Sequence, residues 1–487
     1  MPMSTESPIE VPLCVDLDGT LIRTDTLWES VIILLSRNPL NALLLVFWCV
    51  KGRSHLKRQL AQRVKLDPEA LPYNQEFLAY LREQRGQGRT LLLVTAADRD
   101  VADRIALHTQ IFSEVIASDG LRNLKGEHKR RALEERFGVG RFDYAGDSHA
   151  DLAIWKTCNR SILVNASQGV CREAGTCSTV ARSFARPKFR LKTLVRAIRS
   201  HQWVKNALVF LPVVTSHRVF DPVVMAQAAL AAIAFSLCAS SVYVLNDLID
   251  LASDRAHERK RRRPFAAGDL SIPFGLALMS GLLLACIAMS IWLSLAFQLT
   301  IAIYYGCTLA YSLALKRRLL IDVFMLAGLY TIRVLAGSAA TAIEPSAWLL
   351  AFCLFFFLSM ALVKRFTELR ASSKPSHQRL AGRGYSGVDT DAIGSLGSSA
   401  GFMCVLVLAL YINSPQVAPL YRSPWALWFL CPLLMYWISR VWIMAYRGSM
   451  HDDPILFALR DRVSYITAGC CAIVMAAAAH GIRLPVK

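Results

Sequence analysis

The chain has 487 residues and a formal net charge of +19, and 54% of its residues are hydrophobic. This composition is too apolar for a soluble protein of this length, so we exclude a purely soluble enzyme. The surplus Lys and Arg residues lie mostly in loops beside apolar segments. Membrane topology and phosphate binding therefore explain the positive charge better than nucleic-acid binding, which we do not expect.

Charged residues are concentrated before about residue 200, and apolar runs alternate with short polar loops after it. This division predicts a two-part chain: an α/β domain at residues 1–185, a basic amphipathic linker at 186–202 and a multi-pass membrane domain at 203–487. A basic amphipathic linker suits the anionic cytoplasmic surface of a membrane. The 13 cysteines form no CxxC pair, and many lie inside apolar runs, so we expect reduced thiols.

In the first part, three strand-like runs each end in a polar motif. Strands that alternate with helical patterns predict a doubly wound parallel sheet, in which the carboxyl ends of the strands meet at one edge. Two Asp residues two positions apart suit phosphoryl chemistry, because one can attack phosphorus and the other can protonate the leaving oxygen. The motifs are Asp16 and Asp18 after residues 11–15, Thr95 after residues 91–94, and Asp147 and Asp151 after residues 142–145.

The segments DLDGTL, LLLVTAAD, KGEHK and GDSHAD, in this order, resemble the four motifs of the haloacid dehalogenase phosphatase superfamily, in the branch like phosphoserine phosphatase. The resemblance implies that Asp16 is a nucleophile that forms an aspartyl-phosphate and that Asp18 is the general acid and base. Thr95 and Lys129 would bind the phosphoryl oxygens, with Lys125 as an alternative to Lys129. The resemblance further implies that Mg²⁺ is held by Asp16, Asp18, Asp147 and Asp151.

Residues 25–88 have a helical pattern and would form a cap over this site, as the resemblance implies. One part of it, residues 41–50 (NALLLVFWCV), is too short to span a bilayer and too apolar for a solvated surface. This segment is either the core of the cap or a surface that docks on the membrane. The basic residues that follow it favour docking; they are Lys51, Arg53, Lys57 and Arg58.

The second part predicts an all-α membrane bundle of about nine helices. The basic residues fall in alternate loops, and the positive-inside rule places those loops and the α/β domain on the cytoplasmic side of a bacterial inner or plasma membrane. The first segment is the shortest and the least apolar. The expected segments are 204–216, 223–246, 273–293, 295–315, 320–341, 346–363, 395–413, 424–446 and 463–482.

The stretch NDLIDLASD, residues 246–254, places three carboxylates and an amide at the end of an apolar segment. Helical spacing predicts that Asn246, Asp250 and Asp254 share one face, with Asp247 beside it. Carboxylates at such a position are costly unless they hold cations or face water. Their oxygens suit Mg²⁺, which could bind the diphosphate of a substrate, while the basic run that follows takes the remaining phosphate charge. A solvated helix end is the alternative.

Several polar residues lie within or next to the later apolar segments. Arg333 is deep in its segment and must face the interior of the bundle or a partner. Lys205 follows Trp203 at the start of the first segment, where it could also extend to the membrane surface. Lys364, Arg365 and Glu368 lie at the end of another segment, where they could hold a phosphate or a second metal.

The segments NDLIDLASD, KRRRPFAAG and YSLALKRR resemble the UbiA superfamily of intramembrane prenyltransferases. Together with QWVKN and KRFTEL, they are similar to the decaprenyl-phosphate phosphoribosyltransferase branch, which transfers phosphoribose from phosphoribosyl pyrophosphate to a polyprenyl phosphate. KRFTEL stands where aromatic prenyltransferases have a second Asp-rich motif, which argues against an aromatic acceptor. The implied ligands are a polyprenyl lipid, a soluble diphosphate donor and membrane lipids, and oligomer formation is left open.

The resemblance implies a role for each polar residue. Mg²⁺ on the donor pyrophosphate would be held by Asp247, Asp250 and Asp254, which are also the catalytic residues of this half, with Asn246 assisting. Lys260 and Arg263 would neutralise the leaving pyrophosphate. The remaining substrate-binding residues would be Lys205, Arg333, Lys364, Arg365 and Glu368.

Three functions therefore remain open. The favoured function is a bifunctional enzyme, a Mg²⁺-dependent phosphoribosyltransferase whose fused phosphatase dephosphorylates the lipid product. The first alternative is a transferase that moves a polyprenyl chain from its diphosphate to an aromatic or other small acceptor. The second alternative is a membrane-anchored phosphatase or a lipid-binding protein, which leaves NDLIDLASD unexplained.

Overall fold

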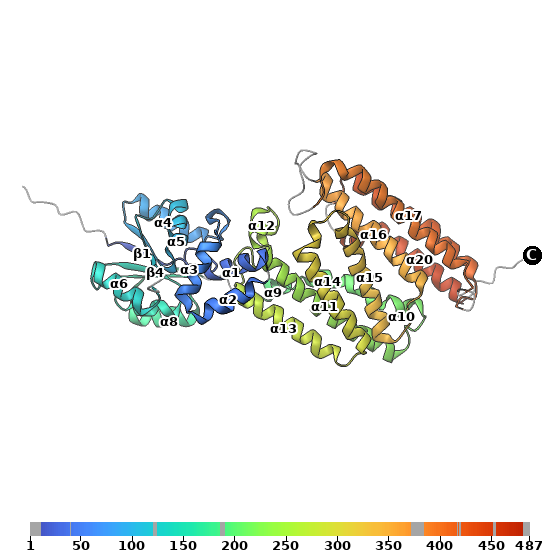
Figure 1. Ribbon diagram of the computed structural model, residues 1–487, viewed down its shortest axis with the longest axis horizontal. Helices are drawn as coiled ribbons and strands as arrows, with labels where there is room; N and C mark the ends of the chain where they lie inside the picture. Colours follow the sequence, from blue (N-terminus) through green and yellow to red (C-terminus); the bar gives the residue numbers. More distant parts are fainter. Residues whose placement is uncertain are drawn as a thin grey trace, which may run out of the picture. The chain divides into compact units, whose positions relative to one another are not determined.

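The computed structural model describes residues 11–480 apart from 39, 120–123, 186–189, 372–383, 416, 418–419 and 451–453 (Figure 1). Four residues of the expected linker, 186–189, thus lie outside the described residues. The chain forms two compact units. Unit 1 consists of Met1–Ser200 and Tyr243–Ser280, and unit 2 consists of His201–Val242 and Gly281–Lys487.

A six-stranded parallel sheet forms the centre of unit 1. Its order is β3-β2-β1-β4-β5-β6, so the sheet is wound outward in both directions from β1, as predicted. Leu13 and Val15 pack into one buried cluster and Cys14 into another, which places a core on each face of the sheet. The strands are β1 (Leu13–Val15), β2 (Leu91–Asp98), β3 (Glu114–Ser118), β4 (Asp143–Gly146), β5 (Ser161–Val164) and β6 (Val180–Phe184).

Short helices surround this sheet. Four of them, α1 (Thr26–Arg37), α2 (Asn41–Val50), α3 (Arg53–Arg63) and α4 (Gln75–Gly86), follow β1 within the stretch where a cap is expected. The apolar segment 41–50 is helical along its whole length. The other helices of the α/β part are α5 (Arg99–Thr109), α6 (Glu127–Phe137), α7 (Leu152–Trp155) and α8 (Gln168–Cys177), with 3₁₀ turns η1 (Pro68–Ala70) and η2 (His149–Asp151). Helix α9 (Leu191–Ala197) follows within the expected linker.

The described residues after α9 are mostly helical. Two helices, α11 (Pro222–Ile249) and α13 (Ile272–Ser290), contribute residues to both units. Between them lie α12 (Leu251–Ala256) and η4 (Lys260–Arg262) in unit 1. Unit 2 also contains η3 (Ser200–Phe210), α10 (Leu211–Thr215), α14 (Leu295–Leu313), η5 (Leu315–Arg317), α15 (Ile321–Thr341), α16 (Ala347–Arg370), η6 (Gly387–Asp389), α17 (Thr390–Ile412), η7 (Pro424–Phe429), α18 (Leu430–Tyr446), α19 (Pro454–Ala458) and α20 (Arg462–His480).

Seven helices in the described part of the chain are long and apolar enough to cross a membrane. They are α11, α13, α15, α16, α20 and the segments Gly387–Ile412 and Pro424–Tyr446. The prediction of an α/β part followed by an all-α membrane bundle is confirmed, and each of the nine expected segments coincides with helical structure. The first is the exception in length, because η3 and the five-residue α10 take the place of one long helix.

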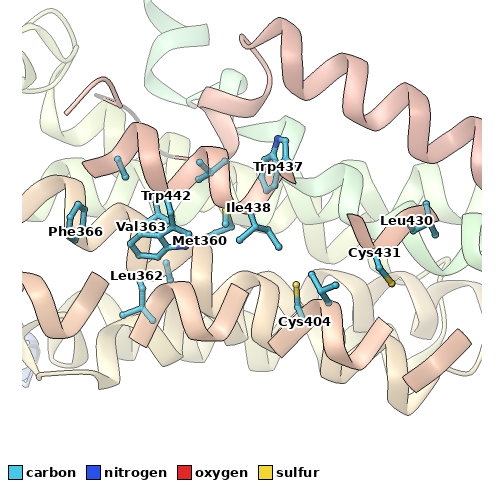
Figure 2. Close-up of a cluster of buried hydrophobic side chains, with 14 of the residues drawn as sticks. Met360, Leu362, Val363, Phe366, Cys404, Leu430, Cys431, Trp437, Ile438 and Trp442 are labelled. Carbon is cyan, nitrogen blue, oxygen red and sulfur yellow. The ribbon is translucent and has the colours of Figure 1, made fainter. Parts of the chain in front are cut away.

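The largest core of unit 2 lies where α16, α17 and α18 pack together. Figure 2 shows Leu362 and Val363 of α16, Cys404 of α17, and Ile438 and Trp442 of α18 in this cluster. A Cβ atom at Gly397 would lie 2.2 Å from Trp442, so only glycine allows this close approach.

Candidate active sites

The first site lies at the carboxyl edge of the sheet in unit 1. Asp16 follows β1, Asp147 follows β4, and Thr95 lies within β2, which continues beyond it to Asp98. Because β1 pairs with both β2 and β4, these residues come from neighbouring strands. The sequence prediction that the motifs meet at one edge therefore agrees with the strand order.

A buried lysine links two of the carboxylates. Lys129, from α6, places its Nζ atom 2.9 Å from Oδ1 of Asp16 and donates a hydrogen bond of 3.0 Å to the hydroxyl of Tyr144. Tyr144 in turn donates to Oδ1 of Asp151 at 2.9 Å. Lys129 is thus the lysine that contacts Asp16, rather than its rival Lys125. Sequence reasoning missed Tyr144, because a tyrosine inside an apolar strand has the pattern of a core residue.

Three of the predicted ligands could hold one metal ion. Asp16, Asp147 and Asp151 can each offer a carboxylate oxygen such that the three oxygens lie within 4.8 Å of one another. Three carboxylates face one lysine, and hard carboxylate oxygens are the donors that Mg²⁺ prefers, so these residues fit the predicted ion. Asp151 is itself held by hydrogen bonds to its Oδ2 atom from Ser148 N (3.0 Å) and Ser148 Oγ (2.9 Å).

Two further residues keep the loop after β1 close to this cluster. Gly19 has a φ of +78°, and a Cβ atom there would lie 2.3 Å from Oδ2 of Asp147. A side chain at this position would therefore displace the carboxylate. Asn165, just after β5, donates a hydrogen bond of 2.8 Å to the carbonyl of Gly19. The sequence offers no signal for Asn165, which lies 146 residues away from its partner.

Burial and crowding raise the pKa of the carboxyls at this site. Burial raises the pKa of Asp147 to about 8, and the neighbouring charges of Asp16 and Asp151 add to the effect. Burial also raises the pKa of Asp16, although Lys129 opposes it. Such a site favours protons or a divalent cation as a source of positive charge.

The predicted general acid and base lies in the turn that follows β1. Asp18 accepts hydrogen bonds from Thr26, at 2.8 Å from the backbone N–H and at 3.3 Å from the hydroxyl. Burial and then the charge of Asp25 raise the pKa of Asp18 to about 7, which suits a group that must both give and take a proton. Lys57 of α3 donates to the carbonyl of Ala96, directly after Thr95, at 2.6 Å.

The acidic stretch 246–254 forms the second site, also in unit 1. Arg263 bridges two buried carboxylates, with its Nη1 atom 3.1 Å from Oδ1 of Asp247 and 2.6 Å from Oδ2 of Asp254. Arg199 forms a second ion pair with Asp247. Burial raises the pKa of Asp254, and the charge of Arg263 opposes this shift. The two buried carboxylates are thus balanced by two arginines, of which the sequence singled out only Arg263.

The carboxylates that share an arginine are not the set that helical spacing placed on one face. α11 ends at Ile249, and Asp250 lies between α11 and α12. Arg263 joins Asp247 to Asp254, whereas Asn246 and Asp250 are half-buried on the same stretch. Lys260 lies exposed in η4, and its charge, like that of Arg263, opposes the upward shift in the pKa of Asp254.

A buried ion pair joins this stretch to the α/β part of unit 1. Arg255 of α12 places Nη2 2.7 Å from Oε1 and Nη1 3.1 Å from Oε2 of Glu29 in α1. Thr24 donates a further hydrogen bond of 2.7 Å to Glu29. The side chains of Arg255 and Glu29 are only 9% and 3% exposed. Sequence reasoning missed this contact, because it joins residues 226 positions apart.

In unit 2, two predicted cations lie beside one aromatic ring, and a third lines a cavity that this ring borders. Lys205 and Arg333 lie 5.6 and 5.3 Å from the ring centroid of Tyr330, and Lys364 lines a small cavity together with Tyr330. Arg333 also donates a hydrogen bond of 2.9 Å to Oδ1 of Asn206. Lys205 and Arg333 are both buried, so this cluster concentrates positive charge. The sequence prediction missed Tyr330 and Asn206.

The other two predicted residues of unit 2, Arg365 and Glu368, form an ion pair with each other. Arg365 is fully buried, and its Nη2 atom also lies 2.6 Å from Oδ2 of Asp322. Tyr385 donates a hydrogen bond to Asp322. These contacts make Arg365 part of a buried network, whereas Lys364 borders the cavity beside Tyr330.

Comparison with known proteins agrees with the resemblance of the membrane half to the UbiA superfamily. Residues 207–481 match the UbiA prenyltransferase family. Protein y4nM of Sinorhizobium fredii is 36% identical over 469 residues, which cover 95% of this chain and 90% of that protein. Decaprenyl-phosphate phosphoribosyltransferase of Mycolicibacterium smegmatis is 30% identical over 289 residues, which cover 58% of this chain and 90% of that protein.

Two solved structures match different parts of the chain. A UbiA homologue from Archaeoglobus fulgidus bound to GPP and Mg²⁺ covers 58% of this chain and 99% of its own, with 15% identity and a TM-score of 0.46. A phosphoserine phosphatase with a phospho-aspartyl intermediate analogue covers 38% of this chain and 98% of its own, with 14% identity and a TM-score of 0.26. Because its family match extends over more than half of its length and includes all seven candidate spans, the chain is an integral membrane protein that belongs to the UbiA prenyltransferase family.

Proposed function

We propose that the membrane half transfers phosphoribose from phosphoribosyl pyrophosphate to a polyprenyl phosphate. The observation that carries this proposal is the 30% identity with a decaprenyl-phosphate phosphoribosyltransferase, which extends over nine-tenths of that relative's length. An oxygen of the acceptor phosphate attacks C1 of the ribose, the bond from C1 to the pyrophosphate oxygen breaks, and pyrophosphate leaves. Mg²⁺, if bound by Asp247, Asp250 and Asp254, would neutralise charge on that pyrophosphate.

The residues of the acidic stretch have separate roles in this proposal. Arg263 bridges Asp247 and Asp254, so it can exchange a carboxylate partner for a phosphate oxygen when the donor binds. Lys260 is exposed and supplies further positive charge for the leaving pyrophosphate. Asn246 assists as a neutral hydrogen-bonding group.

The cations around Tyr330 support an anionic ligand in unit 2. Lys205 and Arg333 are buried beside the ring of Tyr330, so together they offer positive charge to a phosphate group. We assign the phosphate of the polyprenyl acceptor to this cluster, with Lys364 at its border. Arg365 and Glu368 support the cluster from the neighbouring turn of α16 through their own ion pair.

We further propose that the α/β domain is a phosphatase. Asp16 attacks the phosphorus of a phosphate monoester, and Asp18 gives its proton to the leaving alcohol. Asp18 then takes a proton from the water that hydrolyses the aspartyl-phosphate, and inorganic phosphate leaves. Lys129 and Thr95 bind the phosphoryl oxygens, and Asp16, Asp147 and Asp151, with Asp18 nearby, would hold Mg²⁺.

The two activities follow one another in this proposal. Transfer produces a lipid whose ribose carries a phosphate monoester, and a phosphatase in the same chain encounters this product at a raised effective concentration. The basic loops favour the cytoplasmic side for both sites, where soluble phosphoribosyl pyrophosphate is available.

Lipid mass spectrometry tests this assignment. The full-length protein is reconstituted with a polyprenyl phosphate and Mg²⁺ and supplied with phosphoribosyl pyrophosphate. We expect a ribosylated lipid without phosphate from the intact protein and the phosphorylated lipid from Asp16→Asn. Asp254→Asn should form neither product. Consumption of an allylic diphosphate with a small acceptor, in place of phosphoribosyl pyrophosphate, would favour the prenyltransferase alternative. Phosphate release without any transfer would favour an anchored phosphatase.

A further inference from the structure

Helix α2 presents an apolar surface on the α/β domain of unit 1. Leu43 is 73% exposed, Val46 66%, Phe47 56% and Val50 83%, and Leu40 just before the helix is 72% exposed. Isolated apolar residues are common on protein surfaces, but four on a ten-residue helix form a continuous patch. A soluble face of this composition would be a site of aggregation, so the patch requires a partner.

The opposite face of α2 is firmly packed. Trp48 is 4% exposed and lies in a buried cluster with Leu34, Leu56 and Leu60 from α1 and α3. Arg63 of α3 lies 4.7 Å from the centroid of the Trp48 ring. The orientation of α2 is therefore determined by packing, and its outer residues are exposed because of this packing.

Unit 1 also contains the ends of two candidate membrane spans. Residues Tyr243–Ser280 include the end of α11 and the start of α13. The pair between Glu29 and Arg255 connects the α/β domain to the segment between these helices, within the same compact unit. Unit 1 is therefore attached to any bilayer that α11 and α13 cross.

Basic side chains border the apolar patch. Lys51 directly follows α2, is exposed, and lies 4.5 Å from the centroid of the Phe47 ring. Arg58 is exposed on α3. An apolar helix face with lysine and arginine at its margin is the pattern of helices that lie in the interface of a membrane, because the cations meet anionic headgroups.

We propose that α2 inserts its exposed face into the bilayer interface, with phospholipid as its partner. The face would bury Leu43, Val46, Phe47 and Val50 among acyl chains, and Lys51 would lie at the headgroups. α2 leads directly into α3, whose Lys57 reaches the carbonyl of Ala96 beside the first site. Docking of α2 would thus hold α3, and with it Lys57, at the membrane surface. This inference concerns docking only and holds whether or not the domain is a phosphatase.

Photolabelling in nanodiscs tests the proposal on the full chain. The protein is reconstituted in phosphatidylcholine with phosphatidylglycerol and a trace of a phospholipid that carries a diazirine in its acyl chain. After illumination, mass spectrometry maps the labelled peptides. We expect adducts on residues 41–50 at a level comparable to that at Leu284 of α13, which is 66% exposed on a candidate span.

Leu107 of α5 provides a matched control, because it is 76% exposed on the same domain but lies outside α2. Leu43→Ser with Phe47→Ser should reduce the adducts on α2 about tenfold, whereas Leu107→Ser should leave them unchanged. Adducts on α2 no more frequent than at Leu107 would overturn the proposal. Disulfide formation between the exposed Cys49 residues of two copies, without lipid adducts, would assign the face to a second copy instead.

Discussion

The two acidic sites of unit 1 differ in how their buried charge is balanced. At the first site, Asp16, Asp147 and Asp151 face a single Lys129, so the carboxylates exceed the nearby cation by two charges. At the second site, the two buried carboxylates have two arginines. The first site therefore lacks positive charge when its carboxyls are ionised, whereas the buried carboxylates of the second site already have arginine partners.

This difference indicates how each site would bind a ligand. A cation can enter the first site with a net gain, because it relieves repulsion among carboxylates that burial already disfavours. At the second site a cation competes with Arg263, which lies within 3.1 Å of both Asp247 and Asp254. The second site would bind an ion best together with an anionic donor. The phosphate oxygens of the donor could then pair with Arg263 and leave the carboxylates for the ion.

The largest expected effect is the loss of the nucleophile at the first site. Asp16→Asn should reduce phosphate release by about 10⁴-fold or more, because no aspartyl-phosphate can form. Phosphoribosyl transfer should remain unchanged, because it depends on the second site. Both activities can be measured on one reconstituted sample with radiolabelled phosphoribosyl pyrophosphate and a separate phosphate monoester.

Asp103→Asn is the matched control for this variant, since Asp103 is an exposed carboxylate on α5 of the same domain. It should leave both activities intact. Equal loss of transfer and phosphate release in Asp16→Asn would contradict the separation of the two sites.

The ion pair between Glu29 and Arg255 should have the next largest effect. Glu29→Gln leaves a buried arginine without its charge partner, and breaking a buried pair from one side costs about 3–5 kcal/mol. We expect hydrogen exchange to increase in residues 251–268, on the acidic side of the contact, as well as in α1. The exchange is measured by mass spectrometry on the reconstituted protein.

The double variant provides the check on this prediction. Glu29→Gln with Arg255→Met removes both charges, so it should cost less than the sum of the single changes. Additive effects would show that the two residues do not interact, and the two acidic sites would then lack this connection.

The binding of Mg²⁺ should depend on pH most strongly at the first site. The pKa of Asp147 is raised from 3.8 to about 8, so the folded state without metal loses stability as pH rises through this window. Mg²⁺ competes with that proton, and its apparent affinity should therefore increase by about tenfold per pH unit between pH 6 and 8. The midpoint of thermal unfolding, measured against Mg²⁺ concentration at each pH, reports this affinity.

Asp147→Asn removes the group responsible and should remove most of this pH dependence. Asp254→Asn, at the second site, should leave it in place. A dependence that persists in Asp147→Asn would show that another group, such as Asp18 with its pKa of about 7, governs metal binding.

The sequence predicted that the motifs of the first site meet at one edge of the sheet, because these motifs come at the ends of strands. Parallel strands bring their carboxyl ends to one edge, so Asp16 and Asp147 could be placed together from local patterns alone. Tyr144 could not, because an inward-pointing strand residue shows no sign of the hydrogen bonds that it makes. The topology of the membrane half was predictable for a similar reason, since apolar length determines its spans.

The pairing of charges was harder to predict from the sequence. Arg199 lies 48 residues from Asp247, and helical periodicity relates only residues within one helix. The same limit applies to Arg365, which the sequence assigned to a phosphate and the structure pairs with Asp322. Such contacts depend on how separate helices pack, for which a single sequence has no periodic signal.

The smallest expected effect concerns the arginine that distinguishes the second site from the first. Arg263→Gln leaves Asp247 and Asp254 with one arginine, and because the side chain of Arg263 is 29% exposed, water limits the loss of stability to about 1–3 kcal/mol. The variant converts the second site into one with a charge deficit, like the first. We therefore expect Mg²⁺ alone to stabilise Arg263→Gln more than the parent protein, as measured by thermal unfolding. Arg262→Gln, which changes an exposed neighbour, should not show this gain. Equal stabilisation of the two variants by Mg²⁺ would mean that Arg263 does not compete with a cation, and the contrast between the sites would then have another cause.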